Sequence, residues 1–94
     1  MMSEKSDLGL DRFFKLISAA SERSDLLELF RCFFTPEELS ALSLRVNVVK
    51  ALSDGELTQR EIAKQLHTSI SKVTRGSRQL KSVSSTLIEQ MSLL

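Results

Sequence analysis

The fold of this 94-residue chain is decided by the segment Leu57-Thr-Gln-Arg-Glu-Ile-Ala-Lys-Gln-Leu-His-Thr-Ser-Ile-Ser-Lys-Val-Thr-Arg-Gly-Ser-Arg-Gln-Leu-Lys81. Thr58 and Glu61 have the spacing of a capping box, in which two side chains pair with backbone N–H groups at the start of a helix. Apolar residues at helical spacing lie on both sides of His67-Thr68-Ser69, which we expect to form the break between two helices. The segment therefore predicts a helix-turn-helix over residues 58–82.

Positive charge is concentrated in this segment. The net charge of the chain is only +1, but residues 58–82 contain 6 basic and 1 acidic side chains, whereas residues 1–57 contain 7 and 10. A short basic helix fits the major groove of DNA, and a clustered positive charge attracts a polyanion. The alternative is a solvated basic face that has no partner.

The composition predicts an all-α protein of six helices. One proline and three glycines leave few signals for strands and turns, and the length fits one domain. We expect a flexible N-terminal arm over residues 1–8 and a single helical domain over residues 9–94.

Several helix ends can be placed from the sequence. The second helix is expected to start at Ser24 or Asp25, and the last one near Ser84 or Ser85. The central helix has the clearest start, in Thr35-Pro36-Glu37-Glu38, where threonine and glutamate form a second capping box around proline at the first helical position. Its apolar stripe is expected at Leu39, Leu42, Val46, Val49 and Leu52, and Gly55 is expected to end it.

Residues 1–34 are predicted to contain dimerisation helices. All five phenylalanines lie in this part of the chain, and its apolar residues surround more of each helix than one small core needs. Such an excess favours burial against a second copy of the chain. An ordinary intramolecular core is the alternative.

The remaining residues exclude several classes of protein. Cys32 is the only cysteine, so we expect a small buried side chain, no internal disulfide and a reducing cytosol. The chain has no apolar segment of membrane-spanning length and no signal peptide, which predicts a soluble cytoplasmic protein. It has no nucleophile–base pair, metal cluster or phosphate loop, so we expect neither an enzyme nor a metal or cofactor site.

Four residues could bind a small ligand. Gly76 lies inside the second helix of the motif, where glycine costs about 1 kcal/mol; close approach of a ligand or backbone would explain it, and a tolerated glycine is the alternative. Arg45 and Arg75 could sandwich a flat ring and bind an acid group, or they could be ordinary surface arginines. Thr35 already has a capping role, although a helix N-terminus also favours a carboxylate.

Three motifs and one arginine resemble the tryptophan repressor family. They are Phe34-Thr-Pro-Glu-Glu38, Gly55-Glu-Leu-Thr-Gln-Arg-Glu61, Ile70-Ser-Lys-Val-Thr-Arg-Gly-Ser77 and Arg45, and the similarity extends from about Phe34 to Lys81. The resemblance implies an all-α intertwined homodimer that binds L-tryptophan as corepressor and then a palindromic operator. It implies that Arg45 and Arg75 flank the indole ring and that Gly76 leaves room for it. Arg75 and Thr35 would bind the ligand carboxylate. Backbone carbonyls near Cys32 and Phe34 of the partner subunit would accept hydrogen bonds from the ligand amine.

The resemblance also implies the residues that face double-stranded DNA. These are Gln59, Arg60, Lys64, Thr68, Ser69, Ile70, Ser71, Lys72, Thr74, Arg78 and Lys81.

The chain departs from the family at several positions. Gln79 replaces a serine that helps to hold the ligand amine. Ala63 and Lys72 replace a basic and a hydroxyl residue at positions that face DNA. His67 replaces the glycine that helix-turn-helix proteins favour at a left-handed turn position, where histidine is uncommon but allowed.

The sequence thus predicts a tryptophan-dependent transcriptional repressor. One alternative keeps the fold but responds to another ligand or to none, because Gln79 could alter the pocket. An alternative of a different class is a helical adaptor whose basic motif binds an acidic protein.

Overall fold

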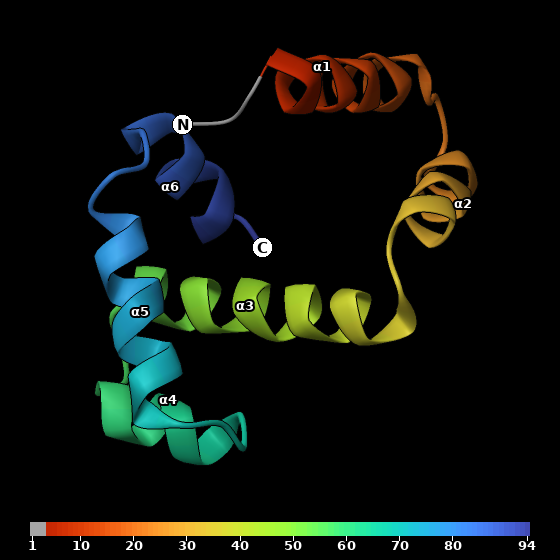
Figure 1. Ribbon diagram of the computed structural model, residues 1–94. Helices are drawn as coiled ribbons and strands as arrows, with labels where there is room; N and C mark the ends of the chain where they lie inside the picture. The colour runs from red at the N-terminus through yellow and green to blue at the C-terminus, as the bar shows by residue number, and fades with distance from the viewer. Residues whose placement is uncertain (1–3) are drawn as a thin grey trace. The chain divides into compact units, whose positions relative to one another are not determined.

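The chain forms six α-helices in the computed structural model, which describes residues 4–94 (Figure 1). They are α1 (Glu4–Ala19), α2 (Arg23–Phe33), α3 (Pro36–Asp54), α4 (Gln59–Gln65), α5 (Ile70–Leu80) and α6 (Ser85–Ser92). The described residues contain no strand, so the predicted all-α fold is confirmed. The chain divides into an N-terminal unit, Met1–Leu39, and a C-terminal unit, Ser40–Leu94.

Aromatic contacts join α1 to α2 in the N-terminal unit. The ring of Phe13 meets the rings of Phe30, Phe33 and Phe34 edge-on, with centroid distances of 5.7, 5.9 and 5.9 Å. The rings of Phe30 and Phe34 stack at 5.3 Å. Such edge-to-face and offset pairs suit the charge distribution of aromatic rings.

The N-terminal unit corrects two expectations about helix starts. Residues 4–8, which were expected in the arm, already belong to α1. The other residues of that arm, 1–3, lie outside the described part of the chain. Helix α2 begins at Arg23, before both expected caps, and Glu22 at its N-cap position makes no side-chain capping bond.

Cys32 is exposed, which corrects the expectation of a buried side chain. The neighbouring Phe30, Phe33 and Phe34 contact Phe13, whereas the Cys32 side chain is not among these contacts.

Helix α3 starts and ends as predicted. The Thr35 N–H donates to Glu38 Oε1 (2.9 Å), and the Glu38 N–H donates to Thr35 Oγ1 (3.1 Å), which completes the capping box. At the other end, Gly55 has a φ of +68°, a left-handed conformation that glycine adopts without a steric penalty.

The core of the C-terminal unit is formed by α3, α4 and α5. Its buried members are Val48, Ile62, Ala63 and Val73, of which Ile62 and Val73 have no exposed surface. Leu44 and Leu52 belong to the partly buried residues around them. Helices α4 and α5 pack side by side near the C-terminal half of α3 (Figure 1).

The buried face of α3 differs in part from the expected stripe. Leu52 packs against the core, but the central contact is Val48, and the expected Leu42 and Val46 are 38% and 43% exposed. Because α3 has apolar residues around most of its circumference, periodicity alone did not identify the face that packs against α4 and α5.

Helix α6 follows α5 after a short turn and starts where expected, with the Ser84 hydroxyl accepting from the Leu87 N–H at 3.2 Å. Lys50 Nζ on α3 donates to Asp54 Oδ1 at 2.7 Å and to the Ser92 carbonyl at 3.5 Å. Among the described residues, none of the helices combines the length and the apolar composition needed to cross a membrane.

Candidate ligand pocket and nucleic-acid interface

The start of α4 is fixed by the predicted capping box. The Thr58 N–H donates to Glu61 Oε1 (3.0 Å), and the Glu61 N–H donates to Thr58 Oγ1 (3.2 Å). These bonds from the backbone and the side chain of Thr58 favour the carboxylate form and lower the pKa of Glu61 below its ordinary value near 4.5.

The turn between α4 and α5 has the predicted left-handed residue. His67 has a φ of +53°, and after it the Thr68 N–H donates to the Ala63 carbonyl (2.9 Å). Ser69 then caps α5 by accepting from the Lys72 N–H at 3.2 Å. These local bonds set the angle at which α5 leaves the turn.

A hydrogen bond between side chains also ties the two helices together. Thr74 Oγ1 on α5 donates to Gln59 Oε1 on α4 at 2.8 Å. Both residues were expected to face DNA, and the bond leaves the Gln59 amide N–H groups available to an acceptor outside the protein. Thr74 therefore positions Gln59 in addition to lining the surface of α5.

Most of the other residues expected at the DNA surface are exposed. A shallow groove along α5 is lined by Ile70, Ser71, Lys72, Thr74, Arg75 and Arg78. Arg60 and Lys64 on α4 are exposed, as are Ser69 and Lys81 at the two ends of α5. We call the groove, together with these four exposed residues, the α5 face, and it is the candidate interface.

Two positions do not reach this interface. The Oγ1 atom of Thr68 is buried and has no hydrogen-bond partner among the described residues, so this atom is not at the surface of the single chain. Ala63 occupies a position that faces DNA in the family, but here it is only 5% exposed and packs in the core, as its place in the apolar stripe of the first helix of the motif predicts. A small side chain there permits the close approach of α4 and α5.

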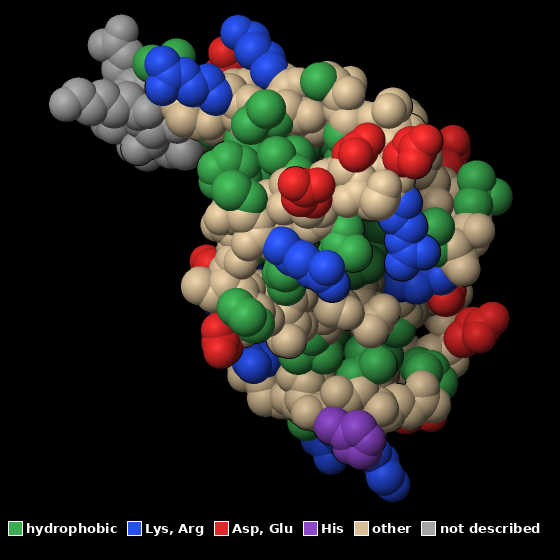
Figure 2. Space-filling model, turned by 90° about the vertical axis from the view of Figure 1, so that its right-hand side faces the viewer, with side chains coloured by type: hydrophobic (Ala, Val, Ile, Leu, Met, Phe, Trp, Pro, Cys, Tyr) green, Lys and Arg blue, Asp and Glu red, His purple; other side chains and the backbone are tan. Residues whose placement is uncertain are grey.

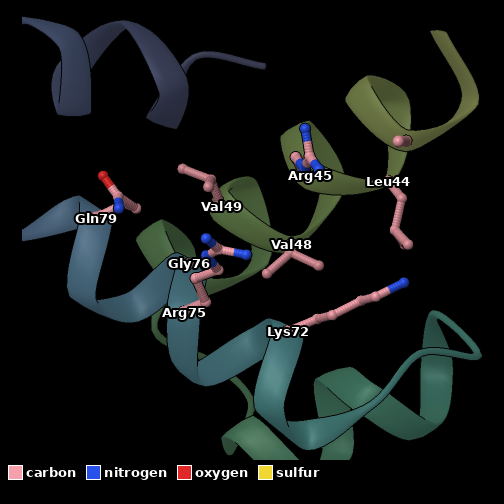
Figure 3. A pocket seen from close by; sticks show the side chains of 9 residues that line it. Leu44, Arg45, Val48, Val49, Lys72, Arg75, Gly76 and Gln79 are labelled. Atoms are coloured by element: carbon pink, nitrogen blue, oxygen red, sulfur yellow. The ribbon is translucent and has the colours of Figure 1, made fainter. Parts of the chain in front are cut away.

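A pocket of about 430 Å³ lies between α3 and α5, within the range of about 300–1,000 Å³ for small-ligand sites. Arg45 projects from α3, while Arg75 and Gln79 project from α5, around an apolar floor that includes Val48 and Val49 (Figure 3). The complete lining is Ala41, Leu44, Arg45, Val48, Val49, Lys72, Arg75, Gly76 and Gln79.

Gly76 allows α5 to pack closely on α3. A Cβ atom at this position would lie 3.0 Å from Val48 Cγ1 and 3.4 Å from Leu52 Cδ1, the first closer than ordinary van der Waals contact. The contact that explains the glycine is therefore a side chain of α3. The same absence of a Cβ atom leaves the backbone of Gly76 exposed to the pocket.

The pocket unites four of the seven residues expected to bind the ligand: Arg45, Arg75, Gly76 and Gln79. The other three belong to the N-terminal unit. There Thr35 caps α3, Cys32 is exposed, and the Phe34 N–H donates to the Phe30 carbonyl while its ring joins the aromatic cluster.

The sequence did not indicate the apolar floor or the presence of Lys72 in the pocket. Ala41, Leu44 and Val48 recur at helical spacing on α3, which was an available signal, but the helix has a competing apolar stripe. Lys72 was assigned to DNA alone, because nothing in its local sequence shows that it lies beside the cavity as well as the groove.

The fold and the site define a helix-turn-helix protein with a pocket between α3 and the second helix of the motif. The family model described as Trp repressor protein matches residues 8–92. The chain therefore belongs to the Trp repressor family, and the resemblance seen in its motifs is confirmed.

Curated relatives agree with this assignment. The chain is 38% identical over 80 residues to a Trp operon repressor homolog of Chlamydia trachomatis serovar D, with 85% of each chain covered. It is 42% identical over 67 residues to a Trp operon repressor homolog of Aliivibrio fischeri, covering 71% of this chain and 62% of the relative. A homolog of the same name from Vibrio campbellii is 36% identical over 80 residues, covering 85% and 80%.

Proposed function

We propose that this chain is a Trp operon repressor that binds L-tryptophan in the pocket between α3 and α5 and then binds operator DNA through the α5 face. The observation that carries the proposal is the pocket itself, where cationic side chains surround an apolar floor. A zwitterionic aromatic amino acid has both an apolar ring and a carboxylate, and an arginine can stack on the former or donate to the latter.

The position of the pocket supports a link between ligand and DNA. The helix that lines the pocket with Arg75, Gly76 and Gln79 also forms the groove with Ile70, Ser71 and Arg78. A ligand wedged between α3 and α5 would hold α5 in one orientation. It shifts DNA binding only by its preference for that orientation, which in allosteric proteins is typically about 1–3 kcal/mol.

The functional unit in this proposal is a homodimer. Large apolar side chains of α1 and α2 are open to solvent, among them Phe14 (55% exposed), Leu27 (43%) and Phe33 (56%), and hydrophobic surface is visible among the charged groups in Figure 2. Exposed apolar surface of this extent marks an interaction site. A dimer also accounts for a palindromic operator, since two reading helices about 34 Å apart enter successive major grooves.

A gel-shift experiment tests the proposal. The operator is first selected from random duplex DNA in the presence of L-tryptophan, and binding of the chosen duplex is then measured with and without the amino acid. We expect a lower apparent dissociation constant with L-tryptophan than without it. Binding that is equally tight without tryptophan would contradict the proposal and favour a regulator that responds to another ligand or to none.

The same experiment separates the proposal from the helical adaptor. Unselected duplex DNA is added as a competitor at matched concentration. Unselected DNA should displace a repressor from the labelled operator far more weakly than unlabelled operator does. A basic surface that binds an acidic protein would not distinguish the two duplexes.

A further inference from the structure

Lys72 lies at the boundary between the ligand pocket and the DNA surface. It lines the pocket together with Arg45 and Arg75, and it also lines the groove of the α5 face together with Ile70 and Arg78. Figure 3 shows its side chain extended from α5 beside the pocket. The ammonium group of lysine has three N–H donors, so it can donate to a group in the pocket and to a group in the groove.

The charge of the pocket is unbalanced. Its lining contains three cations, Arg45, Lys72 and Arg75, and no acidic side chain. Among residues 7–94, whose side chains are described, the ion pairs are Lys15–Asp11 and Lys50–Asp54, so none of the three cations has a carboxylate partner in that part of the chain. Their mutual repulsion is relieved when an anionic group enters the pocket.

We propose that Lys72 is a ligand-binding residue that selects for a carboxylate, in addition to its contact with the DNA surface. The inference rests on the proposed function and names a further residue that determines its ligand specificity. Arg75 and Lys72 lie one helical turn apart on α5, so their cationic groups can approach the same carboxylate from neighbouring positions. A ligand with the same ring and amine but no carboxylate loses this interaction and leaves the three cations uncompensated.

The test compares L-tryptophan with L-tryptophanamide, which keeps the indole and the amine but has no carboxylate. Binding is measured on the full chain without DNA, so that any phosphate contact of Lys72 does not contribute. The chain contains no Trp and no Tyr, so the emission of the added indole reports binding directly. The variants are Lys72→Gln, Lys72→Arg and, as a matched control, Lys15→Gln on α1.

We expect the wild-type chain to prefer tryptophan over the amide. Lys72→Gln should raise the dissociation constant for tryptophan by roughly three- to tenfold. This change lies between the loss of an exposed ion pair, which is small, and the loss of a charged hydrogen bond shielded from water, which is larger. It should leave binding of the amide unchanged or slightly tighter, because a repelling charge is removed. Lys72→Arg should retain most of the preference, and Lys15→Gln all of it.

The outcomes distinguish this inference from the proposed function. If the wild-type chain binds tryptophan but Lys72→Gln keeps the full preference over the amide, or weakens both ligands equally, the role of Lys72 is refuted and the proposed function stands. If the wild-type chain does not bind tryptophan, the proposed function fails and this inference fails with it.

Discussion

The N-terminal pair α1–α2 and the helix-turn-helix α4–α5 differ in how their apolar surface is covered. In the C-terminal unit, Ile62 and Val73 are completely buried by side chains of the same chain. In the N-terminal pair, aromatic contacts join the helices, yet Phe14 and Phe33 remain more than half exposed. The C-terminal unit thus buries apolar side chains within the chain itself, while the N-terminal pair leaves large aromatic side chains exposed, and these form the surface proposed to contact a second copy of the chain.

The largest effect is expected from Ile62→Ala. Truncating this fully buried side chain leaves a cavity between α4 and α5, at a cost of about 2–5 kcal/mol in the free energy of unfolding. Chemical denaturation followed by circular dichroism measures the loss. A cost below about 1 kcal/mol would mean that the C-terminal core is not closed as described.

Phe14→Ala should have a smaller effect of a different kind. This side chain is 55% exposed in the single chain, so its truncation should weaken the proposed dimer, by about 2 kcal/mol if Phe14 is a central contact. Sedimentation over a range of protein concentrations measures the dissociation constant. An unchanged constant, together with an unchanged dependence of the melting temperature on concentration, would show that this surface is not the dimer contact.

Gly76→Ala tests the close approach of α5 to α3. The added Cβ atom meets Val48 Cγ1 at 3.0 Å, and we expect a net loss of about 1 kcal/mol, because overpacking outweighs the gain in helix propensity. The control is the same substitution made in a Val48→Ala background, which removes that contact. There the change should become neutral or stabilising, and an equal loss in both backgrounds would disprove the steric explanation.

The smallest effect is expected from Thr58→Ala at the start of α4, which removes one side of the capping box at a cost of about 0.5–1 kcal/mol.

The pKa of Glu61 is lower in the folded chain than in the unfolded one. Its contribution to stability is therefore present above pH 4.5 and is lost as the pH falls through the lowered pKa. Acid titrations of the wild-type chain and Glu61→Gln should converge below this range, and parallel curves would contradict the assignment.

Local signals were sufficient to predict the helices that have side-chain caps. The capping boxes at Thr35 and Thr58, the end of α3 at Gly55 and the left-handed turn at His67 all depend on residues within a few positions of one another. Helix α2 was placed incorrectly at its start because Glu22 makes no capping bond, so no side-chain cap marks the first residue of the helix.

Tertiary contacts could not be predicted in the same way. The bond from Thr74 to Gln59 spans 15 positions, and the burial of Val48 instead of Val46 depends on which face of α3 meets α4 and α5. The exposure of Cys32 likewise follows from the orientation of α2 and not from its residue type. Arg45 and Arg75, which were candidates from the sequence, line the pocket, but the place of Lys72 beside the cavity required the structure.

The most direct test of the account is the operator affinity of the wild-type chain and of Arg75→Ala, each measured with and without saturating L-tryptophan. Arg75 lines the pocket from α5, so its loss should remove the link between ligand and DNA. We expect tryptophan to tighten operator binding by the wild-type chain about 5- to 150-fold and to leave binding by Arg75→Ala nearly unchanged. An equal tightening in both proteins would contradict a tryptophan site between α3 and α5.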